Sequence, residues 1–123
     1  MPLSILLAED NVVNQRLTLR ILEKEGHRVI VVENGRKAVA AMAEQEFDVV
    51  LMDVQMPEMD GLAATSAIRK EEKRTGKHVP IIAMTAHAMQ DDKQRCLAAG
   101  MDAYISKPMR ARDLLDLVES QSN

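Results

Sequence analysis

Short apolar runs alternate with amphipathic segments along the whole chain, and this alternation limits the possible folds more than any other feature. Five apolar runs have the length and residue content of buried strands: residues 5–8, 29–32, 49–52, 81–84 and 103–105. Between them, apolar residues recur at helical spacing, as in Val13, Leu17 and Ile21 with Leu22, and we expect such a face to pack on a sheet. The segment around Cys96 has a weaker helical pattern. A strand and a helix repeated five times predict a parallel sheet with helices on both faces.

Glycine and proline residues mark the ends of the predicted elements. Gly26, Gly76 and Gly100 each follow a helical segment, where a left-handed glycine cap is typical. Pro80 directly precedes the run at 81–84, where its missing N–H interrupts no strand. The pattern contains no internal repeat, linker or low-complexity segment. Residues 1–123 are therefore expected to form a single domain.

Composition excludes several classes of protein. Of the 123 residues, 46% are hydrophobic and 28% are charged, which is typical of a soluble globular domain. The net charge of -3 argues against nucleic-acid binding, which depends on clustered Lys and Arg. No apolar run approaches the roughly 20 residues that span a bilayer, so we expect no membrane contact by this domain. The only cysteine, Cys96, suits a reducing cytoplasm. The nine methionines fill core space or, alternatively, form an adaptable docking surface.

Polar residues stand at the carboxyl ends of four predicted strands. Glu9 and Asp10 follow the first strand, Asp53 the third, Thr85 the fourth and Lys107 the fifth. In a parallel sheet these ends lie near one edge, where such folds bind ligands. Three crowded carboxylates repel one another and raise the pKa of at least one acid, unless a cation neutralises them. Oxygen ligands without His or Cys favour Mg²⁺, which leaves room for a phosphate.

Asp53 is the candidate nucleophile of this edge. It ends the central apolar run in "FDVVLMDVQMPEMDG" and stands before a loop with Pro and Gly. A carboxylate can attack phosphorus and form an aspartyl phosphate. The ammonium of Lys107 and the hydroxyl of Thr85 could then stabilise charge on the phosphoryl oxygens, together with the metal ion. The pattern predicts phosphoryl transfer to Asp53.

Each of these residues also has a purely structural interpretation. Asp10 or Asn11 could cap the helix that follows. Asp53 alone is typical of a turn, and Lys107 alone is typical of a solvated surface charge. Tyr104 alone is typical of a half-buried strand aromatic. The functional interpretation depends on their meeting at one end of one sheet.

Four motifs together resemble the receiver domain of two-component response regulators. They are "LLAEDN", "VLMDVQMPEMDGL", "IIAMTAHA" and "DAYISKP", and the resemblance covers nearly the whole chain. It implies a flavodoxin-like (βα)5 fold of the α/β class, a three-layer sandwich with a five-stranded parallel sheet in the order 2-1-3-4-5. The sequence of these motifs is most similar to that of the receivers of hybrid sensor histidine kinases.

The resemblance also implies roles for the residues at the strand ends. Asp53 is then the phosphoacceptor. Asp10, Asp53 and the backbone carbonyl of Gln55 bind Mg²⁺ or, in its place, Mn²⁺, and Glu9 supports the metal through water. Thr85 and Lys107 contact the phosphoryl group.

The resemblance implies three further features. Tyr104 is the aromatic residue of the switch, which turns inward when Thr85 is drawn to the phosphoryl group. Gln55 and His87 tune the lifetime of the phosphorylated state. The peptide bond between Lys107 and Pro108 is expected to be cis, and an X-Pro bond allows this at modest cost.

The three histidines are too scattered for a metal site of their own. We expect His27 and His78 to lie at the surface.

The expected function is that of a phosphoacceptor switch in a phosphorelay. It is not a classical enzyme, but a signalling domain that catalyses its own phosphorylation and dephosphorylation. The expected partners are a histidine kinase, or its dimerisation and phosphotransfer domain, and a His-containing phosphotransfer protein. The expected location is the cytoplasm, free or tethered within a membrane hybrid kinase.

Three alternatives stay open at this point. A degenerate receiver would serve only as a docking module. A Mg²⁺-dependent phosphatase with an aspartyl nucleophile usually carries a second acid two residues after the first, where this chain has Gln55. A flavodoxin-type cofactor binder would need a phosphate loop after the first strand, where "AEDNVVNQ" carries acids.

Overall fold

The strands and helices alternate along the chain without exception in the part that the structure describes. A computed structural model describes residues 2–86, 90–107 and 109–122, and the side chains of residues 90–92 are left out. The elements are β1 (Ser4–Ala8), α1 (Val12–Lys24), β2 (Arg28–Val32), α2 (Gly35–Glu44), β3 (Val49–Asp53), α3 (Gly61–Thr75), β4 (Ile81–Thr85), α4 (Gln90–Ala99), β5 (Ala103–Ser106) and α5 (Ala111–Gln121). Each strand contains its predicted apolar run and is one residue longer.

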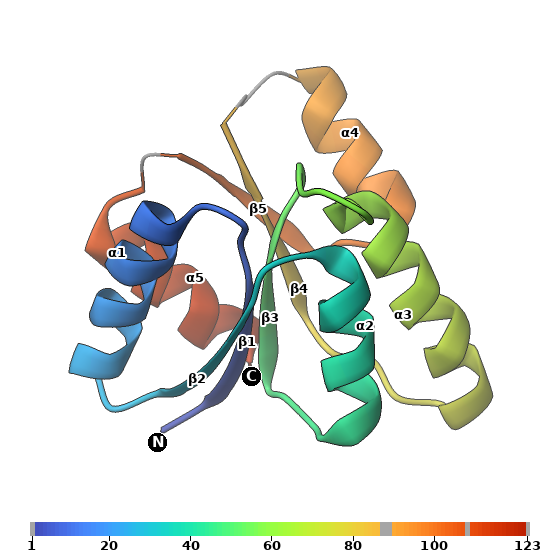
Figure 1. Cartoon of the computed structure of the whole chain (residues 1–123), viewed down its shortest axis with the longest axis horizontal. Coiled ribbons are helices and arrows are strands. Elements are labelled where there is room, and N and C mark those ends of the chain that lie inside the picture. Colours follow the sequence, from blue (N-terminus) through green and yellow to red (C-terminus); the bar gives the residue numbers. More distant parts are fainter. Residues whose placement is uncertain (1, 87–89, 108, 123) are drawn as a thin grey trace.

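The strands form one parallel sheet in the order β2-β1-β3-β4-β5 (Figure 1), as expected. Helices α1 and α5 cover one face of the sheet, and α2, α3 and α4 cover the other. All residues of β3 and β4 are buried, which explains why their sequences are continuously apolar instead of alternating. The predicted three-layer α/β sandwich is therefore confirmed.

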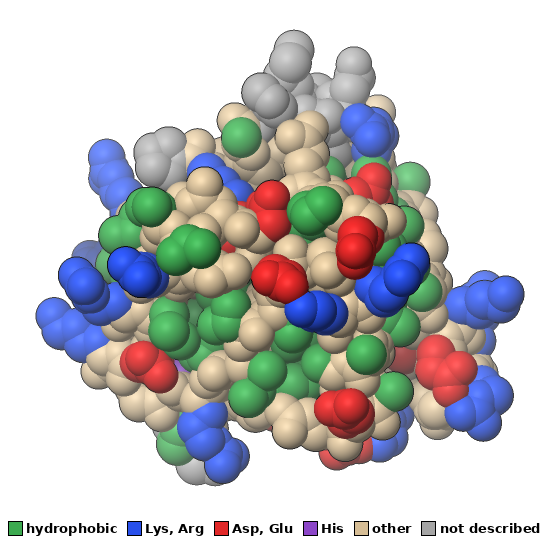
Figure 2. Space-filling view, viewed as in Figure 1, with side chains coloured by type: hydrophobic (Ala, Val, Ile, Leu, Met, Phe, Trp, Pro, Cys, Tyr) green, Lys and Arg blue, Asp and Glu red, His purple; other side chains and the backbone are tan. Residues whose placement is uncertain are grey.

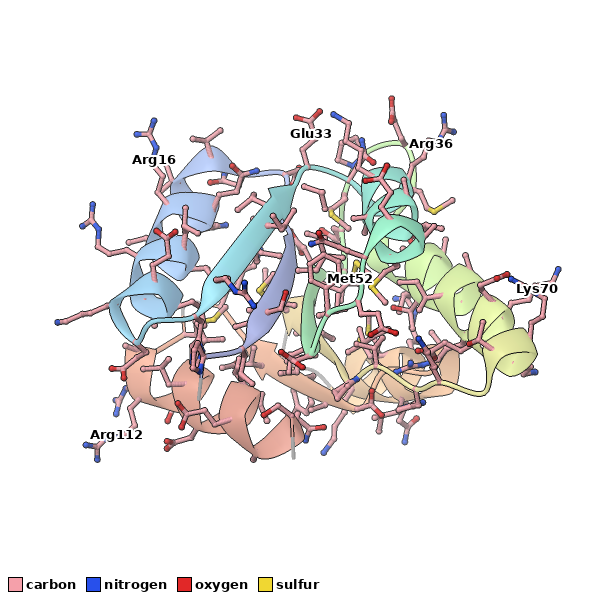
Figure 3. All side chains as sticks on the ribbon, turned by 90° about the horizontal axis from the view of Figure 1, so that it is seen from below. Arg16, Glu33, Arg36, Met52, Lys70 and Arg112 are labelled. Carbon is pink, nitrogen blue, oxygen red and sulfur yellow. The ribbon has the colours of Figure 1, made fainter. Side chains whose placement is uncertain are left out.

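Alternate residues of the central strands feed two separate cores. Leu6 and Val50 pack with α2, α3 and α4, whereas Ile5 and Leu51 pack with α1 and α5. Each fully buried Leu or Ile side chain stabilises the fold by about 1.5–3 kcal/mol relative to exposure. Figure 3 shows Met52 between the sheet and the helices, as expected for a methionine that fills core space.

Local signals explain where the helices begin and end. Side-chain oxygens of Asn11, Asn34 and Asp60 accept hydrogen bonds from the backbone N–H three residues later, at the starts of α1, α2 and α3. The three glycines that were predicted to end helices all have positive φ, between 79° and 108°. The predicted glycine caps are confirmed.

Only part of the predicted face of α1 packs on the sheet. Leu22 is buried and Ile21 packs beside it, as expected, whereas Val13 is 65% exposed and Leu17 is 55% exposed; Thr18, outside the predicted face, is buried. The prediction for Val13 and Leu17 was wrong because helical spacing identifies an apolar face but does not say whether the sheet lies against it. Figure 2 shows hydrophobic side chains at the surface over α1, beside Lys and Arg.

His27 is buried, which also differs from the prediction. Its ring Nδ1 accepts a hydrogen bond from the backbone N–H of Leu3 at 3.1 Å, and this bond joins β1 to the turn before β2. His78, in contrast, is largely exposed. The burial of His27 therefore goes with a side-chain hydrogen bond to Leu3, 24 residues earlier in the sequence.

None of the described helices has the length and apolar content that a membrane crossing requires.

Candidate functional site

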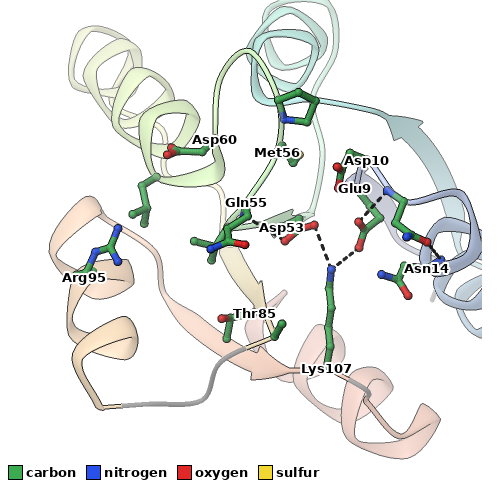
Figure 4. A pocket seen from close by; sticks show the side chains of 15 residues that line it. Glu9, Asp10, Asn14, Asp53, Gln55, Met56, Asp60, Thr85, Arg95 and Lys107 are labelled. Atoms are coloured by element: carbon green, nitrogen blue, oxygen red, sulfur yellow. Dashed lines mark hydrogen bonds and ion pairs between the residues drawn. The ribbon is translucent and has the colours of Figure 1, made fainter.

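The polar residues at the strand ends line one cleft of about 700 Å³ (Figure 4). Asp53 is the last residue of β3 and Thr85 the last of β4, while Glu9 and Asp10 follow β1 and Lys107 follows β5. Parallel strands place these ends at the same edge of the sheet. The structure thus brings together all five residues from four strands.

Three carboxylates form the acidic part of the cleft. One oxygen from each of Glu9, Asp10 and Asp53 lies within 4.8 Å of the others. Glu9 is 1% exposed and Asp53 is 6% exposed, whereas Asp10 is exposed. Buried like charges at this separation need a counter-charge.

Lys107 supplies that counter-charge within the protein. Its Nζ lies 2.7 Å from Glu9 Oε1 and 3.1 Å from Asp53 Oδ2. Figure 4 shows the ammonium group between the two carboxylates. One cation cannot neutralise three acids, so the cleft keeps a negative charge that favours a further cation.

The environment shifts the pKa values of two of these groups. Burial raises the pKa of Glu9 above its ordinary value of 4.5; the hydrogen bond from Lys107 opposes the rise, and neighbouring Asp53 adds to it. Burial alone would lower the pKa of Lys107, but the bonds to Glu9 and Asp53 outweigh it, so this pKa lies above its ordinary 10.5. Lys107 therefore stays protonated at neutral pH.

Backbone groups orient the acids. The N–H of Asn11 donates to Glu9 Oε2 at 3.1 Å, and the N–H of Gln55 donates to Asp53 Oδ1 at 3.3 Å. With Lys107 on Asp53 Oδ2, both oxygens of Asp53 have a donor. These contacts fix the orientation of the Asp53 carboxylate in the cleft.

The donor set of the cleft fits a small divalent cation. Its ligand atoms are carboxylate oxygens, and the group found among the described residues contains no His or Cys. Gln55 lines the same cleft, two residues after Asp53. Glu9, Asp10, Asp53 and the carbonyl of Gln55 are the residues that could hold such an ion.

Thr85 and Tyr104 lie in different places. Thr85 is 6% exposed and lines the cleft, and its carbonyl accepts a hydrogen bond from the N–H of Lys107 at 2.7 Å. Tyr104 lies on β5, partly buried, with Lys93 Nζ 5.1 Å from the centre of its ring. Tyr104 pairs with Ala83 of β4, which stands two residues before Thr85, so Tyr104 and Thr85 lie on adjoining strands.

The expectations for His87 and for the cis bond at Pro108 fall outside the described residues.

Sequence reasoning missed other residues of the cleft. Arg95 of α4 and Asp60 at the start of α3 line it opposite the acids of β1, and Asn14 of α1 also lines it (Figure 4). Asn14 lies in the first turn of the helix that follows Glu9 and Asp10, and this nearness in sequence could have indicated it. No sequence signal could have indicated Arg95, because its position depends on how α4 packs.

A family model described as response regulator receiver domain matches residues 5–119 of the chain. The sensor protein GacS of Pseudomonas syringae pv. syringae is 47% identical over 93% of this chain, which corresponds to 13% of GacS. Hybrid signal transduction histidine kinase I of Dictyostelium discoideum is 41% identical over 98% of this chain, or 7% of its own length. The chain therefore spans only a small part of these curated relatives.

Solved structures agree with this match. The receiver domain of a sensor histidine kinase from Pseudomonas aeruginosa PAO1, solved with magnesium in its active site cleft, is 41% identical with a TM-score of 0.90. The comparison covers 99% of this chain and 98% of that one. The receiver domain of the Saccharomyces cerevisiae response regulator Ssk1, solved with the histidine phosphotransfer protein Ypd1, is 30% identical with a TM-score of 0.93, over 98% of this chain and 89% of that one. This chain belongs to the family of response regulator receiver domains.

Proposed function

We propose that residues 1–123 act as one receiver domain, which accepts a phosphoryl group from a phosphohistidine onto Asp53 and passes it on or changes affinity for a partner. One observation carries the proposal: the Asp53 carboxylate lies at the end of β3, 3.1 Å from Lys107 Nζ and within 4.8 Å of acids from β1. An oxygen of Asp53 attacks phosphorus, the P–N bond of the donor breaks, and the donor imidazole, already protonated on its other ring nitrogen, leaves as the neutral base. The product is an acyl phosphate on Asp53.

The protein's own groups have distinct roles in this step. Lys107 balances charge on the phosphoryl oxygens, because its ammonium stays protonated and already contacts the attacking carboxylate. The hydroxyl of Thr85 donates a hydrogen bond to a phosphoryl oxygen. The N–H of Gln55 holds the second oxygen of Asp53 in place.

The acids of the cleft would hold Mg²⁺, with Mn²⁺ as a substitute, in this proposal. Asp10, Asp53 and the carbonyl of Gln55 would bind the ion directly and Glu9 through water. The bound ion would neutralise the negative charge that develops on the transferring group. The acidic oxygen donor set supports this assignment.

The first experiment measures intact mass after incubation with acetyl phosphate, with and without Mg²⁺, for the parent and for Asp53→Asn. We expect one phosphoryl adduct in the parent with Mg²⁺, and none without Mg²⁺ or in Asp53→Asn. An adduct in Asp53→Asn would mean that another acid is the acceptor. No adduct under any condition would favour the docking-module alternative, and turnover of free phosphomonoesters would favour the phosphatase.

We also propose that Thr85 and Tyr104 form the output switch. Thr85 ends β4, and Tyr104 lies on the neighbouring strand, so a pull on Thr85 acts on the surface that Tyr104 occupies. Such a change can shift a two-state equilibrium by about 1–3 kcal/mol. Thr85→Ala should still be phosphorylated, more slowly, and should lose its coupling to Tyr104. Parent-like partner binding on phosphorylation of Thr85→Ala would contradict the switch.

The lifetime of the acyl phosphate depends, in this proposal, on Gln55 and His87. Gln55 lines the cleft two residues after Asp53, where its side chain can control the approach of water. The domain would then hydrolyse its own phosphoryl group at a rate set by this pair. Separate substitutions of Gln55 and His87 should change the dephosphorylation rate, and unchanged decay in both would remove them from this role.

The exposed face of α1 is the proposed docking surface for the phosphodonor protein. Val12, Val13 and Leu17 are all more than half exposed, and Asn14 on the same helix lines the cleft. A donor histidine that reaches Asp53 must bring its own protein against this rim, and exposed apolar side chains favour such burial. The solved complex of Ssk1 with Ypd1 supports a His-containing phosphotransfer protein as the partner class. Relatives that are hybrid histidine kinases support a kinase as the other partner.

Val13→Glu tests this surface. It should slow phosphoryl transfer from a donor protein while leaving the reaction with acetyl phosphate unchanged, because only the protein donor needs the apolar face. Equal slowing of both reactions would place the defect in the cleft instead. In this proposal the domain works in the cytoplasm, in keeping with its single cysteine, the buried Cys96.

A further inference from the structure

The loop between β3 and α3 forms one wall of the cleft. Val54, Gln55, Met56 and Pro57 of this loop all line it. Under the proposed function, the Gln55 carbonyl is a metal ligand, so the position of this backbone affects metal binding directly.

The base of the loop is closed by backbone contacts. The N–H of Gly61 donates to the carbonyl of Val54 at 2.9 Å, and the N–H of Val54 donates to Met84 of β4 at 3.0 Å. A Cβ at Gly61 would lie 2.2 Å from the carbonyl oxygen of Asp53, so α3 can begin this close to the acceptor only with glycine there. The two ends of the loop are thereby fixed to the sheet.

The tip of the loop has an unusual backbone conformation, which is held from within the loop and from α2. Glu58 has φ of 65°, in the left-handed region that residues other than glycine rarely adopt. The N–H of Met59 donates to the carbonyl of Pro57 at 2.7 Å, which closes a tight turn with Glu58 at its centre. Further support comes from the start of α2, which lies beside the loop in Figure 1.

Two neighbouring residues at the start of α2 hold the tip. Asn34 Nδ2 donates to Glu58 Oε2 at 3.1 Å, and the N–H of Gly35 donates to the carbonyl of Met59 at 2.9 Å. A Cβ on Gly35 would lie 2.3 Å from that same carbonyl oxygen. Asn34 is only 4% exposed whereas Glu58 is exposed, so the donor side of this bond is the side shielded from water.

Asn34 therefore makes two separate hydrogen bonds, each through a different side-chain atom. Its Oδ1 caps α2 by accepting from the N–H of Lys37 at 2.8 Å, while its Nδ2 holds Glu58. Aspartate would cap a helix equally well, because it keeps the accepting oxygen. Only the amide of asparagine can also donate to a carboxylate.

We propose that Asn34 is a positioning residue for the phosphorylation site, which fixes the β3–α3 loop through Glu58 and so places the Gln55 carbonyl for metal binding. This inference rests on the proposed function. It assigns to the β2–α2 junction, on the far side of the loop from the cleft, a share in metal affinity.

Asn34→Asp is the sharpest test, because it keeps the cap of α2 and replaces the donor by a second carboxylate facing Glu58. We expect Mg²⁺ affinity, measured by calorimetric titration with the metal alone, to fall about three- to tenfold, the effect of losing one hydrogen bond. The rate of phosphorylation by acetyl phosphate at saturating Mg²⁺ should fall as well. Arg36→Gln is the matched control, since it changes the net charge by the same amount in the same turn of α2, at an exposed position.

The double variant Asn34→Asp/Glu58→Gln separates positioning from general stability. It reverses the polarity of the bond, because Gln at 58 can donate to Asp at 34, and it restores the net charge of the parent. We expect its Mg²⁺ affinity to return to within about twofold of the parent, with urea unfolding recorded for every variant.

Three outcomes would overturn the inference: parent-like Mg²⁺ affinity in Asn34→Asp, an equal loss in Arg36→Gln, or no recovery in the double variant. Failure of the proposed function looks different, because the parent itself would then bind no Mg²⁺ and form no adduct. That result would overturn both proposals together.

Discussion

The contact of Lys107 with two buried acids makes a quantitative prediction for Lys107→Met. Methionine keeps most of the apolar stem and removes the ammonium group, which lies 2.7 Å from Glu9 Oε1 and 3.1 Å from Asp53 Oδ2. The side chains of Glu9, Asp53 and Lys107 are 1%, 8% and 18% exposed. The substitution therefore leaves two nearly buried carboxylates without their cation.

The expected cost is about 2–3 kcal/mol of unfolding free energy at neutral pH without metal. Removal of one partner from a fully buried pair costs about 3–5 kcal/mol. The cost expected for Lys107→Met is lower than for a fully buried pair because Lys107 keeps some solvent contact. Glu9 can also take up a proton, which limits the penalty. Hydrogen bonds to charged groups, worth about 1.5–3 kcal/mol each, give a similar size.

The pH dependence follows from the direction of the Glu9 shift. Burial already raises the pKa of Glu9, and loss of Lys107 removes the hydrogen bond that opposes the rise. A carboxyl group with a raised folded-state pKa binds its proton more readily when folded, so the folded state gains stability as pH falls through that pKa. The deficit of Lys107→Met should shrink between about pH 7.5 and about pH 5. Lys107 itself does not titrate in this window, because its pKa lies above 10.5.

Urea unfolding followed by far-ultraviolet circular dichroism is the suitable assay, because the chain has no Trp. It compares Lys107→Met with the parent at both pH values, with chelator and with excess Mg²⁺, which should reduce the deficit by supplying a counter-charge. Lys70→Met, at an exposed lysine that points away from the fold in Figure 3, is the control. A loss of unfolding free energy below about 0.5 kcal/mol, or a loss that changes with neither pH nor Mg²⁺, would refute the electrostatic account.

Three further substitutions test other parts of the structure. Thr65→Val should raise the unfolding free energy by about 1 kcal/mol in urea, because the buried Thr65 Oγ1 has no hydrogen-bond partner among the described residues; a loss of stability would mean that a partner exists. Gly61→Ala should cost about 1–3 kcal/mol and slow phosphorylation by acetyl phosphate, since its Cβ would lie 2.2 Å from the carbonyl oxygen of Asp53; a parent-like rate would show that α3 can move aside. Asp10→Asn should stabilise the metal-free domain by up to about 1 kcal/mol, because it removes one of three clustered charges, and should weaken Mg²⁺ binding in calorimetry; unchanged stability would mean that the acids are already screened.

Regular features of the fold could be predicted because they depend on local patterns. A strand buried on both faces must be continuously apolar, so β3 and β4 were visible in the sequence. Glycines with positive φ marked the helix ends for a steric reason that acts within a few residues. The strand boundaries were one residue short, because polar Asp53 and Thr85 belong to the strands but do not look apolar.

Features that depend on packing between distant segments were not predictable. The exposure of Val13 and Leu17 depends on how α1 lies on the sheet, and the burial of His27 depends on its bond to Leu3. Arg95 enters the cleft only because of the position of α4. Helical spacing carries no information on these contacts.

The sequence by itself determined the order of strands and helices and the acids, hydroxyl and lysine that stand at the strand ends, because hydrophobic periodicity and strand direction are local properties. The tertiary structure alone decided which of these groups touch. Lys107 reaches Glu9 across 98 positions of sequence and Asp53 across 54, and Asn34 reaches Glu58 across 24. Such contacts arise where loops from separate strands meet at one edge of the sheet, and their distances depend on the packing of the whole domain.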